Sequence, residues 1–140
     1  MFKVMGVDHI GIAVNDLDAV GKFWTEQLGI PCTGKEVVAE QKVETSFNPT
    51  PNGSEIELLA ATEPTSPIAK FIEKNGGRGG IQHIALRVDN IENAIADLMA
   101  KGVKMIDEKP RYGAGGAKIA FIHPKATHGV LLEICEHEDR

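Results

Sequence analysis

The chain has 140 residues, of which 42% are hydrophobic and 25% are charged, a composition typical of one globular domain. Its formal net charge of −5 argues against nucleic acid as a partner, because phosphate binding requires a basic surface. The sequence has no apolar run as long as a membrane span and no signal-peptide pattern at its start. We therefore expect a cytoplasmic protein with no membrane partner.

The first half of the chain predicts one strand, one helix and three further strands. The apolar spacing of residues 16–28 predicts a helix that ends at Gly29 and buries Trp24. The strands are expected at residues 8–14, 36–38, 44–47 and 54–60.

The second half repeats this order after a short connector helix. Ser66 and Pro67 are a helix start, and residues 75–77 end that helix after Lys74. A helix is then expected at residues 91–101, and strands at residues 81–88, 103–107, 118–123 and 130–135. The predicted fold class is α+β, with two fused βαβββ modules in a single domain. Module one spans about residues 5–62, the connector about 65–76 and module two about 80–136.

The two halves also align directly in sequence. Residues 7–17 align without gaps on residues 81–91, which pairs His9 with His83. Residues 53–59 align on residues 129–135, which pairs Glu57 with Glu133. Two histidines and two glutamates that recur by symmetry predict a metal site built across a pseudo-twofold axis.

The alternation of side chains predicts where these four residues point. Each histidine should lie on the strand face away from the following helix, and each glutamate should lie opposite its apolar neighbours. A carboxylate inside an apolar strand requires a cationic partner or a proton, and a divalent metal would supply the former. The alternative for Glu57 is that it faces water at a sheet edge.

Two imidazole nitrogens and two carboxylate oxygens suit a borderline divalent ion such as Co, Mn, Ni, Zn or Fe. Octahedral coordination by His9, Glu57, His83 and Glu133 would leave two positions open. A substrate with two oxygens could chelate there, with its carbonyl polarised by the metal.

Outside this quartet, the remaining titratable side chains carry weaker expectations. Cys32 and Cys135 form no CxxC pair, and we expect Cys135 to be a small filler beside the site. His128 and His137 are expected at the surface.

Three stretches resemble the vicinal oxygen chelate superfamily, whose βαβββ modules form a metal-holding cup with curved, mixed sheets. They are DHIGIAV at residues 8–14, SPIAKF at 66–71, and PRYGAGGAKIAFIHPK at 110–125, which is followed by GVLLE at 129–133. The last stretch makes the chain most similar to the methylmalonyl-CoA epimerases. The resemblance implies an acyl-CoA substrate, a homodimer, and metal ligation by His9, His83 and Glu133. Glu57 falls where some members ligate through glutamine.

The reaction that this resemblance implies is epimerisation at carbon 2 of methylmalonyl-CoA, by proton transfer through an enolate. Inversion needs two acid/base groups, and Glu133 is the first candidate. In part of the family a glutamate early in the third strand serves as the second. Thr45 occupies that place here, so either the register slips and Glu44 serves, or another group does. Arg111, Lys118 and Lys125 are candidates for binding the coenzyme A phosphates.

Three other functions on the same fold stay open at this point. A glyoxalase I-type lyase would use the same metal and enolate chemistry on a glutathione hemithioacetal, although residues 110–125 argue against it. An extradiol dioxygenase would need two histidines and one carboxylate, with metal positions free for oxygen and substrate. A fourth ligand at Glu57 would occupy one of those positions. A non-enzymatic drug-sequestering protein would need no metal.

Overall fold

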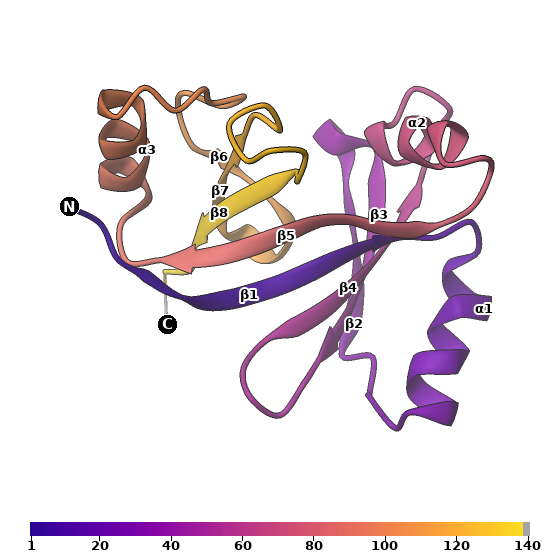
Figure 1. The fold of residues 1–140 in the computed structure, drawn as a ribbon. Helices are drawn as coiled ribbons and strands as arrows, with labels where there is room; N and C mark the ends of the chain where they lie inside the picture. The colour runs from indigo at the N-terminus through magenta and orange to yellow at the C-terminus, as the bar shows by residue number, and fades with distance from the viewer. Residues whose placement is uncertain (139–140) are drawn as a thin grey trace. The chain divides into compact units, whose positions relative to one another are not determined.

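The computed structural model describes residues 1–138 and confirms the α+β class with the βαβββ order in both halves (Figure 1). The first series is β1 (Val4–Ala13), α1 (Leu17–Lys22) continued by the π-helical turn η1 (Phe23–Gln27), β2 (Gly34–Val38), the short 3₁₀ turn η2 (Ala39–Gln41), β3 (Val43–Pro49) and β4 (Glu55–Ala61). The connector helix is α2 (Pro67–Lys74). The second series is β5 (Gly80–Val88), α3 (Ile91–Ala100), β6 (Arg111–Tyr112), the 3₁₀ turn η3 (Ala114–Gly116), β7 (Lys118–Ile122) and β8 (Leu132–Glu136).

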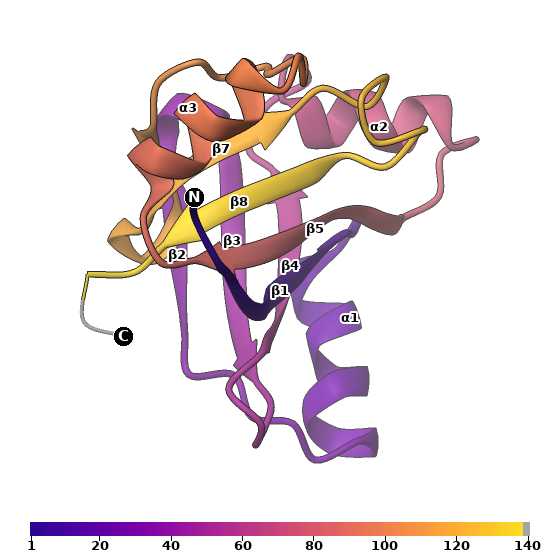
Figure 2. The same cartoon turned by 60° about the vertical axis from the view of Figure 1, so that its left-hand side comes forward.

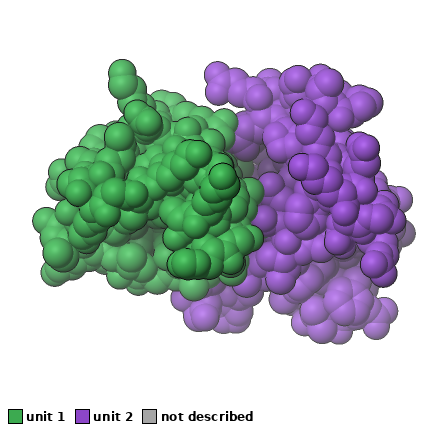
Figure 3. All heavy atoms as spheres, turned by 45° about the horizontal axis from the view of Figure 1, so that its top comes forward, with its two compact units in different colours: residues 1–8, 83–140 green, residues 9–82 purple. Residues whose placement is uncertain are grey.

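The chain divides into two compact units, which Figure 3 colours separately. Unit 1 contains residues 1–8 and the residues from 83 onward, and unit 2 contains residues 9–82. The division falls within β1 and β5, so each of these strands contributes its two ends to different units. Helix α2 belongs entirely to unit 2.

Unit 2 is a sheet with strand order β2-β3-β4-β1, in which β1 and β4 run parallel and the other pairs run antiparallel. The Asp16 side chain caps α1 by accepting a hydrogen bond from the Ala19 N–H at 3.0 Å. Val14, Leu17 and Leu58 form the buried cluster beneath this helix, with Trp24 packed against it. Trp24 therefore belongs to the core, as predicted.

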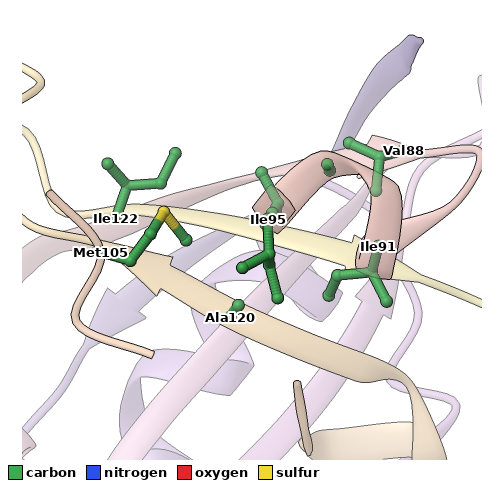
Figure 4. Packing of buried hydrophobic residues seen from close by; sticks show 8 residues of the cluster. Val88, Ile91, Ile95, Met105, Ala120 and Ile122 are labelled. Carbon is green, nitrogen blue, oxygen red and sulfur yellow. The ribbon is translucent and has the colours of Figure 1, made fainter. Parts of the chain in front are cut away.

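Unit 1 repeats the arrangement with strand order β5-β8-β7-β6. Strands β5 and β8 run parallel, and β7 pairs antiparallel with β8 and β6. Helix α3 packs on β7 and β8 (Figure 2). Its buried residues Ile91 and Ile95 pack with Val88, Met105 and Ile122, among others, in the cluster drawn in Figure 4.

The strand predicted at residues 103–107 is the one element that the structure contradicts. Only Met105 forms an isolated bridge, to Ile122, and the strand that pairs with β7 is β6. The backbone N–H groups of Ile106 and Asp107 both donate to the same carbonyl oxygen of Phe121, at 2.9 and 3.2 Å. Two consecutive donors to one acceptor are typical of a β-bulge, which locally disrupts the ladder, so this segment pairs with β7 irregularly.

Within residues 1–138, no helix combines the length and the apolar character that crossing a membrane would require.

Candidate active site

Two of the four predicted ligands, His9 and Glu57, lie within unit 2. In the parallel pair β1 and β4, Gly11 is opposite Glu57, so His9, two residues earlier on the same face, lies beside that carboxylate. The His9 Nδ1 atom is 3.5 Å from Glu57 Oε2. Both residues are buried, with 6% of their surface exposed. Glu57 therefore does not face water.

The second pair lies within unit 1 and has the same construction. In the parallel pair β5 and β8, Ala85 is opposite Glu133, and His83 lies two residues before Ala85. The His83 Nε2 atom is 3.4 Å from Glu133 Oε1. His83 and Glu133 are also buried, at 6% and 4% exposure.

The duplication seen in the sequence is thus a duplication of geometry. In each half a small residue, Gly11 or Ala85, faces the glutamate and leaves room beside it. Each half joins an imidazole nitrogen to a carboxylate oxygen at 3.4–3.5 Å in a buried setting. This donor set fits a borderline divalent cation, since neutral imidazole and carboxylate are the ligand types that such ions take.

The register of β3 places Thr45, and not Glu44, on the face of Glu57. Phe47 is directly opposite Glu57 and Thr45 is opposite Leu59, whereas Glu44 is opposite Ala60. Ala60 packs with the cluster under α1, so Glu44 lies on the face of the sheet that α1 covers. The pairing of β3 with β4 is regular over its whole length, so the predicted acid/base Glu44 lies on the face of the sheet opposite Glu57.

Around Glu133 the wall is apolar. Ala85, Ala117, Ile119 and Cys135 form a buried cluster against which Phe121 packs. Burial, together with the negative charges of Asp8 and Glu133, raises the pKa of the Cys135 thiol well above its usual range. A thiol that stays protonated is a poor nucleophile, which agrees with the expectation that Cys135 is a filler.

The sequence reasoning missed a buried ionic network in unit 1 beside this wall. The Asp8 Oδ1 atom accepts hydrogen bonds from Arg87 Nη2 at 2.7 Å and Nε at 3.1 Å. The His137 Nε2 atom lies 2.8 Å from the same oxygen, so His137 is not an ordinary surface residue. The available signal was an aspartate directly before His9 and an arginine on the strand face of His83. The potential metal-ligand atoms of Asp8, Cys135 and His137 lie within 4.8 Å of one another. However, the Arg87 guanidinium already pairs with Asp8 and supplies a cation there.

Two of the three basic residues predicted as candidates for binding the coenzyme A phosphates have carboxylate partners. Arg111 Nε lies 3.3 Å from Asp107 Oδ1, and Lys118 Nζ lies 3.6 Å from Glu92 Oε2. Lys125 is exposed and its backbone N–H donates to His123 Nδ1.

Residues 8–121 match the model of the Glyoxalase/Bleomycin resistance protein/Dioxygenase superfamily. The chain belongs to this superfamily, and its duplicated βαβββ order is consistent with that fold.

Among named relatives, the chain is similar to methylmalonyl-CoA epimerases, and the resemblance drawn from its motifs is confirmed. It is 37% identical to the human mitochondrial methylmalonyl-CoA epimerase, over 91% of this chain and 72% of that one. It is 36% identical to the ethylmalonyl-CoA/methylmalonyl-CoA epimerase of Cereibacter sphaeroides, over 91% of this chain and 95% of that one. A solved methylmalonyl-CoA epimerase in complex with methylmalonyl-CoA and NH4+ superposes with a TM-score of 0.90 at 37% identity, covering 98% of this chain and 97% of that one.

Proposed function

We propose that this protein interconverts the two configurations of methylmalonyl-CoA at carbon 2, as an isomerase of the racemase/epimerase class. The observation that carries the proposal is the similarity to epimerases over nearly the whole chain, one of them solved with methylmalonyl-CoA bound. The two buried histidine–glutamate pairs supply the chemistry that this reaction needs.

His9, Glu57, His83 and Glu133 are the proposed ligands of one divalent metal ion. Their support is the donor set, the burial of all four side chains and the equal register in the two halves. When bound, such an ion would act as a Lewis acid that stabilises the negative charge developing on the substrate oxygens. Co, Mn, Ni, Zn and Fe all suit these ligands.

Glu133 is the proposed acid/base group. Carbon 2 of the substrate lies between a thioester carbonyl and a carboxylate, so its proton is acidic enough for a carboxylate base to remove. Inversion requires a second acid/base group on the other side of the planar enolate, which delivers a proton to the face opposite Glu133. His83 holds the Glu133 carboxylate at 3.4 Å, and the apolar cluster around it keeps water from the reactive carbon. Glu44 is not included, because it lies on the helix side of β3.

The test is hydrogen exchange with purified protein, manganese and methylmalonyl-CoA in heavy water. Deuterium should enter carbon 2, the rate should fall in EDTA, and the variant Glu133→Gln should lose about 10²- to 10⁴-fold in rate. The matched control is Glu138→Gln, which removes an exposed carboxylate of the same unit and should keep the wild-type rate. Wild-type protein that catalyses no exchange with any of the five metals would refute the epimerase proposal.

Ethylmalonyl-CoA is a second substrate to assay, because it carries the same acidic carbon between a thioester and a carboxylate. A glyoxalase-type lyase would be active on methylglyoxal and glutathione. An extradiol dioxygenase would consume oxygen with catechols. A drug-sequestering protein would contain no metal. The homodimer and the cytoplasmic location stay predictions, which sedimentation and cell fractionation would test.

A further inference from the structure

In unit 1, Arg111 is held over an aromatic ring that touches a proposed ligand. The Arg111 guanidinium carbon lies 5.6 Å from the centre of the Phe121 ring, within the range of a cation–π interaction. Its Nε atom lies 3.3 Å from Asp107 Oδ1. The arginine side chain is 39% exposed, so its position is set by these two partners and not by full burial.

Asp107 closes this arrangement into a ring of contacts. Its second oxygen, Oδ2, accepts a hydrogen bond from the backbone N–H of Phe121 at 2.9 Å. The carbonyl oxygen of Phe121 accepts in turn from the backbone N–H groups of Ile106 and Asp107. The backbone and the ring of Phe121 are therefore both restrained, the first by Asp107 directly and the second through Arg111.

Phe121 passes this restraint to His83. The two rings meet edge to face, with centroids 5.6 Å apart and an interplanar angle of 81°. Phe121 is also directly opposite Glu133 in the pairing of β7 with β8, so it shares the strand face of that glutamate. A fixed phenyl ring at this place limits the rotation of the imidazole and keeps His83 Nε2 near Glu133 Oε1.

The first half of the chain does not repeat this device. Phe47 is opposite Glu57 as Phe121 is opposite Glu133. However, the register places Glu36 where the second half has Arg111, since Glu36 is opposite Thr45 and Arg111 is opposite Ile119. A carboxylate cannot make a cation–π contact, so the two halves differ at this position.

We propose that Asp107, Arg111 and Phe121 form a brace that orients the His83 imidazole for metal binding. The brace rests on the proposed function, because it supposes that His83 is a ligand. In this proposal Arg111 and Phe121 are positioning residues, because they act on the metal site through the contact of Phe121 with His83. Groups that orient a ligating histidine commonly change metal affinity by an order of magnitude or more when they are replaced.

The experiment titrates metal-free protein with Mn²⁺ and measures the free ion by electron paramagnetic resonance. Arg111→Met keeps the length of the side chain and removes its charge, and Phe121→Leu removes the ring. Each should weaken Mn²⁺ binding roughly tenfold, while Arg111→Lys, which keeps a cation, should recover much of the loss. Lys101→Met is the matched control, because Lys101 also pairs with an aspartate four residues earlier, Asp97, on helix α3. It should bind Mn²⁺ as the wild type does.

A second measurement follows the histidine rings in the metal-free protein by ¹H–¹⁵N NMR. The His83 ring signals, assigned by their loss in His83→Gln, should shift and broaden in Arg111→Met, and those of His9 should not. This measurement also detects a variant that binds metal weakly because it folds poorly. The signals of all histidines would then change together, and that result would count against the brace.

The possible results separate the two proposals. Wild-type protein that binds no Mn²⁺ would refute metal ligation by the four residues, whatever Arg111 does. Tight binding by the wild type with unchanged affinity in Arg111→Met and Phe121→Leu would overturn the brace alone. A raised KM for acyl-CoA in Arg111→Met with unchanged Mn²⁺ affinity would also overturn it, because Arg111 would then be a substrate contact.

Discussion

Replacing Arg87 with methionine should be one of the most damaging single changes at this site. The Asp8 carboxylate is 3% exposed, and Arg87 gives two hydrogen bonds to its Oδ1 atom. Methionine fills much of the same volume but leaves the buried charge without its main partner. Breaking a buried ion pair from one side costs about 3–5 kcal/mol.

The size of the loss follows from the surroundings of the pair. The Arg87 side chain is 24% exposed, so water already screens part of its charge. His137 stays 2.8 Å from the same oxygen and offers some compensation. We therefore expect the lower end of the range, about 3 kcal/mol in the free energy of unfolding. For a chain of this length that corresponds to a decrease of about 10 °C in Tm.

The assay is urea and thermal unfolding followed by circular dichroism, in EDTA so that bound metal does not contribute. Lys101→Met, which breaks an exposed pair, should cost less than about 0.5 kcal/mol. The double variant Arg87→Met with Asp8→Asn should recover part of the loss, because the buried group is then neutral. A cost below about 1 kcal/mol for Arg87→Met would refute the reasoning, since it would mean that Asp8 does not depend on this arginine.

Four further outcomes follow from the same structure. Glu44→Gln should leave deuterium exchange into methylmalonyl-CoA within about twofold of the wild type, because Glu44 lies on the helix side of β3; a loss on the order of 10² or more would restore it as an acid/base. Removal of metal should lower the unfolding free energy by about 2.7 kcal/mol, relative to protein at a free metal concentration a hundredfold above the Kd. Equal Tm values with and without EDTA would contradict the metal site. A thiol reagent should titrate the exposed Cys32 in the folded protein and Cys135 only after unfolding. Because the pKa of Cys135 is raised in the fold, the unfolded chain loses its thiol proton first and stability should decrease above the ordinary thiol pKa of 9.0, an effect that Cys135→Ala should abolish.

Local patterns in the sequence were enough to predict most of the elements and the pairing of functional residues. Strand alternation around His9 and Glu57 depends only on the period of two, and the cap and first turn of α2 follow from Ser66 and Pro67. The duplicated alignment then related His9 to His83 and Glu57 to Glu133 without any knowledge of the fold. These features were predictable because each arises from residues close together in the chain or from the repeat itself.

Other features were decided only by how strands pair. The sequence left open whether Glu44 or another group is the second acid/base, and only the register of β3 against β4 shows that Thr45 shares the face of Glu57 while Glu44 lies on the other. A one-residue shift in that register would have exchanged the two residues, and no local propensity favours one register over the other. The irregular pairing of residues 103–107 also depends on a partner strand, because Ile106 and Asp107 both donate to one carbonyl of β7.

The sequence by itself thus determined the two histidines and two glutamates of the candidate site, and the tertiary structure decided which of them contact each other and what surrounds them. The pair of Arg87 with Asp8 joins residues 79 positions apart, and the contact of Phe121 with His83 joins two strands that are not neighbours in the chain. Such contacts depend on the accumulated register of several strands and on the direction of each side chain. Neither quantity is encoded in a short stretch of residues, so these partners became visible only once the chain was folded.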